Sequence, residues 1–263
     1  MNESFDISAI SYDTVFTNSH IGKLQRKRVH DFLITTFPKN SSLEILEVNC
    51  GTGHDAIWLS TLGHRIIATD ISTEMIAVAN SKLTKESNQP DFRQLDINSL
   101  DNTDFNRSFD LIFSDFGGLN CLSPLELENF FSAAVKKLKP NGKIVAVIMP
   151  KNCLMESLYF IMKGNFSSVF RRNTKKAVLA NVENTSVKTW YYNPKDIKKN
   201  SSSYFRIQKT KPIGFFIPPS YLESFFKNRL GLLKLLNRLD SFFKHSTFIS
   251  SFSDHYIISL SKK

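Results

Sequence analysis

The sequence predicts an α/β fold of the doubly wound type, in which a mostly parallel sheet lies between layers of helices. Three observations lead to this prediction. Short apolar runs alternate with amphipathic helical stretches between residues 24 and 150. A glycine turn, Gly51-Thr52-Gly53, follows the first run, and an acidic residue, Asp70, follows the second. Because strands that alternate with helices at this spacing form βαβ units, we expect a parallel sheet.

The first half of the chain supplies five predicted strands and the helices between them. An amphipathic helix over residues 24–37 comes first and ends at Pro38, since proline cannot continue a helix. The turn Pro140-Asn141-Gly142 introduces the fifth strand. The strands are expected at residues 43–49, 65–69, 91–95, 109–114 and 143–149, with helices at 55–62, 73–82 and 124–137.

The second half is less regular and supplies two more strands of the sheet. Apolar residues at helical spacing predict a helix over residues 154–172, and a Leu- and Phe-rich stretch predicts another over 221–244. The whole chain, 1–263, is interpreted as a single domain in which residues 1–150 form a ligand-binding core with an N-terminal cap. Further elements are expected at 187–192 (strand), 194–199 (helix), 204–209 (strand) and 255–260 (strand).

Charge divides the chain into two unlike halves. Residues 1–150 hold 14 Lys/Arg and 18 Asp/Glu, whereas residues 151–263 hold 20 Lys/Arg and 6 Asp/Glu. A basic surface of this kind can bind an acidic carrier protein, an anionic membrane or RNA, or can simply be a solvated lysine-rich surface. The first thirty residues do not resemble a signal peptide, and the three cysteines lack metal-ligand spacing. We therefore expect a cytoplasmic protein without a metal site.

The segment from Glu47 to Gly53 is the best candidate for a ligand-binding loop. It ends one predicted strand and opens a helix, so its glycines allow close approach of the backbone and the helix start offers free N–H groups. Asp70 ends the next strand, 19 residues after Gly51. A carboxylate at that place can accept hydrogen bonds from ribose hydroxyls.

In these motifs the chain resembles class I S-adenosylmethionine-dependent methyltransferases, particularly the methyltransferase-domain group that includes ubiquinone- and menaquinone-type enzymes. The resemblance covers about residues 43–150. The family usually has glycine where this chain has Asn49, and a second glycine is common where it has Lys143. Asparagine tolerates positive φ better than other non-glycine residues. The matching motifs are Glu47–Gly53, Asp70–Met75, Leu95–Ile97, Phe109–Asp115 and Leu138–Lys143.

The resemblance implies a Rossmann-like methyltransferase fold of seven strands, the last of them antiparallel. It also implies S-adenosylmethionine as methyl donor and S-adenosylhomocysteine as product. Asp96 would then bind the adenine amino group, and Tyr12 would cover the cofactor. The residues expected to bind the cofactor are Tyr12, Glu47, Asn49, Cys50, Gly51, Gly53, Asp70, Ile71, Met75, Asp96, Ile97, Ser114 and Phe116.

A nicotinamide-binding domain is the main alternative for this loop. Such domains favour Gly-x-Gly-x-x-Gly, and Ala56 at the last position is an accepted variant. The later segments distinguish the two classes. Asp96 after the third strand and residues 113–118 after the fourth fit a methyl donor rather than a nicotinamide.

The methyl acceptor is expected beyond the carboxyl ends of the parallel strands, where ligands of open α/β sheets bind. Three segments should converge there: residues 12–23 and two insertions expected to be helical, the first lid segment (151–190) and the second lid segment (218–253). Both insertions are long and apolar, so they should exclude water. The acceptor-pocket candidates on this side are Glu156, Tyr191, Tyr192 and Tyr221.

Two residues are candidates for catalysis. His255 begins the final predicted strand on the active side and could act as a general base, or it could only cap the strand. Asp115 likewise has two possible roles: it could contact the reacting atoms, or it could hold the loop after the fourth strand. Methyl transfer from a sulfonium is a direct displacement, so positioning of the acceptor supplies much of the rate and a base is added where deprotonation is needed.

The favoured function is methyl transfer to a hydrophobic small molecule, aromatic or polyene-like, either free or presented on an acyl carrier. An acidic carrier protein or a membrane surface is the expected macromolecular partner, and nucleic acid is not expected. Ser114–Gly118 lacks the Asn/Asp-Pro-Pro-aromatic arrangement of base-amine methylation, and Cys121 and Cys153 lack the setting of pyrimidine methylation. An RNA methyltransferase that uses the basic half and a non-catalytic cofactor-binding partner protein are the alternatives.

Overall fold

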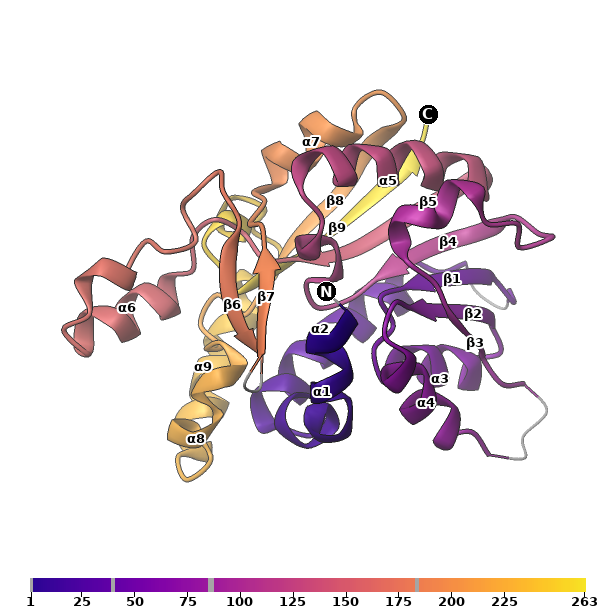
Figure 1. Cartoon of the computed structure of the whole chain (residues 1–263). Coiled ribbons are helices and arrows are strands. Elements are labelled where there is room, and N and C mark those ends of the chain that lie inside the picture. Colours follow the sequence, from indigo (N-terminus) through magenta and orange to yellow (C-terminus); the bar gives the residue numbers. More distant parts are fainter. Residues whose placement is uncertain (1, 39–40, 85–87, 183–184) are drawn as a thin grey trace.

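A computed structural model describes residues 2–38, 41–84, 88–182 and 185–263 (Figure 1). Its main sheet has seven strands in the order β3-β2-β1-β4-β5-β9-β8. The pairs among β1 to β5 are parallel, and β9 runs antiparallel to both neighbours. The predicted doubly wound sheet is therefore confirmed. The strands are β1 (Glu44–Val48), β2 (Arg65–Asp70), β3 (Asp91–Gln94), β4 (Phe109–Ser114), β5 (Leu138–Ile148), β8 (Phe205–Ile213) and β9 (His255–Lys262).

Alternation of side chains along the strands builds a core on each face of the sheet. On one face, Leu46 and Val48 of β1 pack with aromatic residues of α5 (Pro124–Lys137) and with Ile197 of α7 (Pro194–Ser201). On the other face, Ile45 packs with residues of α2 (His20–Thr36), α3 (His54–Thr61) and α4 (Thr73–Ser81). The two helical layers lie on opposite sides of the strands in Figure 1.

Side-chain caps fix the helix starts that surround the site. The Ser72 side chain accepts a hydrogen bond from the Met75 N–H at the start of α4, and Ser19 accepts one from Gly22 at the start of α2. At α5, Ser123 and Glu126 form a capping box with Pro124 at the first helical position. Such caps satisfy N–H groups that the helix itself leaves free.

The chain opens with a helix that the sequence did not predict. Helix α1 (Asn2–Tyr12) continues into a π-helical turn, Asp13–Thr17, which leads to α2. It packs against α4, and Ser72 Oγ donates to Asp6 Oδ1 over 2.5 Å. The N-terminal segment therefore lies at the side of the sheet where β1 and β2 end.

The two lid segments contain less helix than predicted. In the first, α6 (Leu154–Met162) ends before Gly164, which has φ of 68° and so stops the helix, and a hairpin of β6 (Val178–Val182) and β7 (Thr185–Thr189) follows. In the second, a turn at residues 227–229 separates α8 (Glu223–Phe226) from α9 (Leu230–Phe243). Phe226 of α8 and Leu233 of α9 enter the same apolar cluster. The helices predicted over 154–172 and 221–244 are therefore shortened and interrupted, while the strand predicted over 187–192 overlaps β7.

None of the helices in the described part of the chain combines the length and the apolar character needed to cross a bilayer.

Candidate functional site

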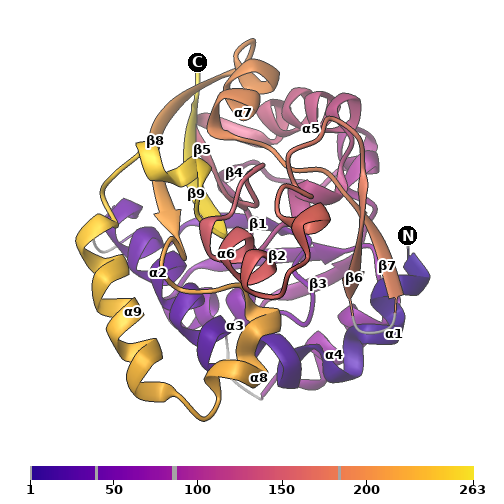
Figure 2. The same ribbon diagram turned by 90° about the vertical axis from the view of Figure 1, so that its left-hand side faces the viewer.

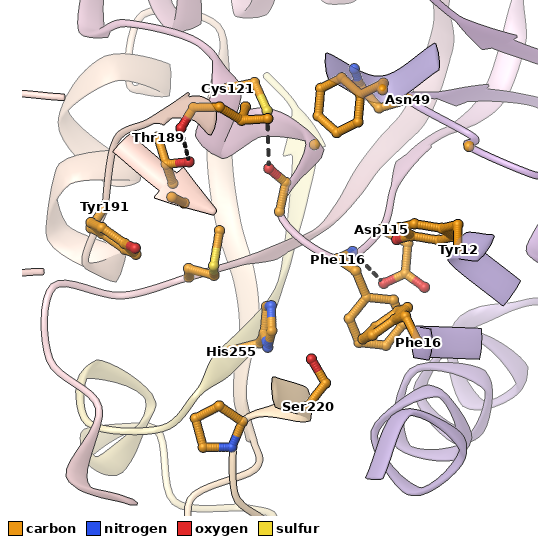
Figure 3. A pocket seen from close by; sticks show the side chains of 18 of the residues that line it. Tyr12, Phe16, Asn49, Asp115, Phe116, Cys121, Thr189, Tyr191, Ser220 and His255 are labelled. Atoms are coloured by element: carbon orange, nitrogen blue, oxygen red, sulfur yellow. Dashed lines mark hydrogen bonds between the residues drawn. The ribbon is translucent and has the colours of Figure 1, made fainter. Parts of the chain in front are cut away.

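A cavity of about 670 Å³ lies at the carboxyl ends of the parallel strands (Figure 3). Residues after β1, β2 and β4 form its floor, and the N-terminal segment forms one wall. Both lid segments and the start of β9 form the rest. This volume falls within the usual range for small-molecule sites. The lining includes Tyr12, Phe16, Asn49, Gly51, Asp70, Asp96, Phe116, Tyr159, Arg171, Tyr191, Tyr221 and His255.

The loop after β1 takes the backbone conformation that its sequence requires. Asn49, Gly51 and Gly53 all have positive φ, at 58°, 53° and 74°. A side chain at Gly53 would also meet Phe92 at 2.5 Å, so that position needs glycine for space as well. The prediction that Asn49 accepts a left-handed conformation is confirmed. Gly51 and Asn49 both line the cavity, which brings the loop backbone to the ligand.

Asp70 is held rigidly at the end of β2 with its carboxylate at the cavity. Its Oδ2 accepts a hydrogen bond from the Gly51 N–H (2.9 Å), and its Oδ1 accepts one from the Ser72 N–H (3.0 Å). Burial raises the pKa of Asp70, although these N–H groups oppose the shift. Each carboxylate oxygen keeps acceptor capacity for a ribose hydroxyl. Asp96 caps the 3₁₀ helix Ile97–Asn102 and also lines the cavity, with Ile71, Met75 and Ile97 as apolar neighbours.

An acidic cluster, made of Glu47, Asp55 and Asp115, lies beneath the glycine loop with Arg26 as its cation. Arg26 contacts Asp55 directly, and its Nη1 lies 3.7 Å from Asp115 Oδ2. Burial and the charge of Asp55 raise the pKa values of Glu47 and Asp115 well above the ordinary range. Burial acts the same way on Asp55, but Arg26 and His30 outweigh it and hold its pKa well below the ordinary value. Three carboxyl groups around one guanidinium favour an additional cation.

Several buried polar atoms of this region match the charged end of S-adenosylmethionine. Glu47 Oε2, Asn49 Oδ1 and Asp115 Oδ2 are acceptors without a hydrogen-bond partner among the described residues. These acceptors fit the ammonium group of the methionine moiety. Arg26 Nε is likewise an unpaired donor and fits the carboxylate. The residues present therefore fit the cofactor.

The N-terminal segment closes over the glycine loop. Thr52 Oγ1 donates to Asp13 Oδ1 (2.7 Å), and Lys82 pairs with the same carboxylate. Tyr12 lines the cavity and its ring lies 5.6 Å from that of Phe16, which in turn packs edge-on against Phe116. This arrangement puts aromatic rings in the cavity wall beside the glycine loop; that Tyr12 covers the cofactor stays a prediction.

His255 lies on the acceptor side of the cavity beside an acidic partner. Figure 3 shows its ring in the pocket near Ser220 and Phe116, and the Phe116 ring is 5.5 Å away in an edge-on arrangement. His255 Nδ1 lies 3.1 Å from Asp254 Oδ2. Burial raises the pKa of Asp254, but His255 and Arg172 outweigh it, so its pKa is held low and the group is a carboxylate. The contact between the two side chains is electrostatic, because His255 Nδ1 has no hydrogen-bond partner among the described residues.

A buried polar network extends from this pair into the first lid segment. Arg172 Nη2 donates to Asp254 Oδ1 (2.9 Å), and the same guanidinium contacts Glu156. Glu156 Oε1 accepts from Tyr221 Oη at 3.1 Å. Gln25 of α2 donates to Asp254 Oδ2 at 2.9 Å. The network therefore ties α2, both lid segments and β9 into one cavity wall.

Not all predicted site residues line the main cavity. Tyr191 and Tyr221 do, whereas Glu156 is buried behind the wall in its ion pairs. Tyr192 instead packs in the main core and its hydroxyl donates to the Leu122 carbonyl, because successive residues of an extended chain point to opposite sides. Its assignment to the acceptor pocket was wrong. Glu47 and Cys50 lie at the smaller pocket under the loop, and Gly53 and the buried Ser114 support the loops from behind.

Sequence reasoning missed Arg26, Gln25, Arg171 and Arg172. Arginines next to apolar runs were a usable signal, because a charged residue is rarely buried unless it is paired. For Asp115, an N–H bond from Phe116 and the Arg26 contact favour the loop-holding role over contact with reacting atoms.

Strand order, glycine loop and strand-end carboxylates together point to one fold class. The chain has the Rossmann-like fold of class I S-adenosylmethionine-dependent methyltransferases, and its central part is similar to them in sequence. Residues 45–142 match the family model described as a methyltransferase domain. The finer resemblance to ubiquinone- and menaquinone-type enzymes stays a prediction.

Among curated proteins the chain is similar to two malonyl-[acyl-carrier protein] O-methyltransferases. It is 30% identical to that of Marinomonas sp. over 164 residues, or 57% of each chain. It is 36% identical to that of Bacillus anthracis over 87 residues, which cover 31% of this chain and 30% of the relative. The chain thus spans little more than half the length of these relatives at most. Among solved structures, the magnesium protoporphyrin IX methyltransferase of Synechocystis PCC 6803 with bound S-adenosylhomocysteine superposes with a TM-score of 0.55 at 15% identity, covering 93% of this chain and 84% of that one.

Proposed function

We propose that this protein transfers the methyl group of S-adenosylmethionine to a hydroxyl oxygen of an apolar, aromatic or polyene-like small molecule. The observation that carries the proposal is the His255–Asp254 pair in a cavity wall that is otherwise mostly aromatic and aliphatic. A hydroxyl is a weak nucleophile until it loses its proton, so a histidine beside a carboxylate suits this acceptor.

The chain's own residues divide the work between two ends of the cavity. Asp70 and Asp96 would hold the ribose and the adenine, while the acidic cluster and Arg26 would hold the methionine moiety. S-adenosylmethionine would supply an electrophilic methyl group: an O–C bond would form to the acceptor as the S–C bond breaks, with S-adenosylhomocysteine as the leaving group. His255 Nε2 would take the hydroxyl proton, and Asp254 would stabilise the resulting imidazolium. Tyr191 and Tyr221 would orient the acceptor against the aromatic wall.

A carboxylate on a carrier-bound acyl group is the second candidate acceptor. The names of the two curated relatives favour it, and so does Arg171, which lines the cavity and could pair with a carboxylate. A carboxylate is already ionised at neutral pH and needs no base. The two candidates therefore differ in their dependence on His255.

A labelled-donor screen tests the proposed function directly. The protein would be incubated with methyl-labelled S-adenosylmethionine and, separately, with lipid-soluble metabolite extract, acyl carrier proteins loaded with acidic acyl groups, and total RNA. We expect label in an apolar small molecule as an alkali-stable ether. Label as an alkali-labile ester on the carrier would establish the second candidate instead. Label in a defined RNA would contradict both, and the steep salt dependence of phosphate contacts would accompany it.

A further inference from the structure

The first lid segment exposes an unusually apolar tip. Met162, Phe166 and Phe170 are 77%, 71% and 70% exposed, and Leu158 and Ile161 are also exposed. All five belong to α6 or to the turns that follow it, and α6 projects from the body of the molecule in Figure 1. Contiguous apolar exposure of this kind marks an interaction surface rather than ordinary solvent-facing residues.

The inner side of the same tip belongs to the cavity. Tyr159 and Phe160 lie between the exposed Leu158 and Ile161 in sequence and line the cavity, as does Arg171. Tyr159 also packs against the apolar cluster of Leu222, Phe226 and Leu233 in the second lid segment. The tip thus connects the cavity wall directly to whatever covers its outer side. An apolar molecule leaving that covering phase would reach the cavity without crossing open water.

The charge of the lid segments indicates that the partner on the outer side of the tip is anionic. Between Glu156 and Glu183 the chain has three exposed cations, Lys163, Lys175 and Lys176, and no acidic residue; Arg171 and Arg172 of the same stretch are neutralised by their ion pairs with Glu156 and Asp254. Between Glu223 and Asp240 the second lid segment has four more, Lys227, Arg229, Lys234 and Arg238, again with no acidic residue. Leu232, Leu235 and Phe242 of α9 are exposed beside these cations. Figure 2 shows α6 facing the viewer with α8, α9 and the β6–β7 hairpin around it, so both cation-only stretches border one side of the molecule.

We infer that the tip of the first lid segment, with α9 beside it, docks on the surface of an anionic lipid membrane. Amphipathic segments with lysine or arginine beside bulky apolar residues bind in this way, with the apolar side chains entering the headgroup boundary. A second copy of the chain would bring like charge to like charge. An acidic carrier would engage the lysines but leave Met162, Phe166 and Phe170 in water. The acceptor would then enter the cavity from the lipid. This entry route rests on the proposed function, whereas the docking on the membrane is independent of it.

Co-sedimentation with lipid vesicles tests the docking without any acceptor. The protein should sediment with vesicles of phosphatidylglycerol and phosphatidylcholine in equal parts, and much less with phosphatidylcholine alone. The double variant Met162→Glu/Phe166→Glu should bind at least about tenfold more weakly, because it removes apolar insertion and adds repulsion. Lys175→Glu should weaken binding by roughly fivefold or more, as expected for one basic residue near an anionic surface.

The matched control is Leu125→Glu at the start of α5, where the leucine is 68% exposed on another part of the surface. It should bind vesicles like wild type, and so should His255→Ala, which separates docking from the proposed chemistry. Equal sedimentation of Met162→Glu/Phe166→Glu and Leu125→Glu would overturn the inference. A lack of binding to anionic vesicles would overturn it too. In that case, a dimer in light scattering that the double variant breaks would identify a second copy as the occupant, and tight binding to an acidic carrier protein would identify the carrier.

Discussion

Replacing His255 by alanine should lower kcat by about 10²–10⁴-fold, the usual contribution of a general base. S-adenosylmethionine affinity should stay close to that of wild type, because the polar groups assigned to the cofactor, Asp70, Asp96 and Arg26 with its acidic cluster, have no ion pair or hydrogen bond with His255 in the described part of the chain. Steady-state kinetics with the acceptor found in the labelled-donor screen, combined with calorimetry, would measure both. His245→Ala, which removes an exposed histidine, is the control and should change neither quantity.

A role for His255 in catalysis rather than in structure has its own signature. In His255→Ala, an acceptor analogue whose hydroxyl is already ionised at neutral pH should regain much of the lost rate, because no proton has to be removed. Asp254→Asn should show the same pattern more weakly, since the histidine would keep its place but lose its orienting charge. Unchanged kcat in His255→Ala would reduce this residue to a strand cap and favour a carboxylate acceptor.

Replacing Arg26 by methionine should lower the free energy of unfolding by about 3–5 kcal/mol, because it leaves the buried Asp55 carboxylate without its main cation. The Arg26 side chain is only 7% exposed, and its guanidinium carbon lies 5.0 Å from the centre of the Phe116 ring; methionine keeps an unbranched apolar side chain in that space. Urea denaturation at neutral pH would measure the loss. Lys27→Met on the same helix is the matched control. Its ion pair with Asp31 is exposed, so its stability should stay within about 0.5 kcal/mol of wild type.

The stability difference should also depend on pH in one direction. Because Arg26 holds the pKa of Asp55 below its unfolded value, the pair stabilises the fold at neutral pH and loses that effect as the pH falls. The gap between wild type and Arg26→Met should therefore narrow on acidification. A gap that stays constant down to the unfolding pH, or that is no larger than for Lys27→Met, would show that Arg26 does not carry this charge balance.

The regular half of the molecule could be predicted because its signals are local. Each core strand is a short apolar run, and the Asn49–Gly53 loop and Asp70 lie where βαβ geometry puts a ligand. Helix α1 was not predicted because its apolar residues do not lie on one side of the helix. Its sequence therefore shows neither the 3.6-residue period of an amphipathic helix nor the two-residue period of a strand. The lids were misjudged because apolar residues at helical spacing continue past Gly164, where the backbone turns instead.

The acceptor side of the site was harder to predict because it depends on distant contacts. Asp254 forms hydrogen bonds with Arg172 and Gln25, which lie 82 and 229 positions away in the sequence. No local sequence pattern predicts contacts between residues so far apart. Tyr191 and Tyr192 looked equivalent in sequence, yet one faces the cavity and the other the core. The orientation depends on the strand-like backbone after β7 and on the bond from the Tyr192 N–H to the Met149 carbonyl.

The central claim is that the cavity binds S-adenosylmethionine, and calorimetric titration tests it most directly. We expect a dissociation constant within roughly 1 μM–1 mM, the usual range for enzyme ligands, and no binding of NAD. Asp70→Ala should weaken S-adenosylmethionine binding by roughly ten- to a hundredfold, the effect of losing hydrogen bonds to a charged group. Binding should also release protons and tighten as pH rises, because the ligand's positive charges lower the raised pKa values of Glu47 and Asp115. NAD binding at comparable strength, or an Asp70→Ala variant with unchanged affinity, would contradict the account.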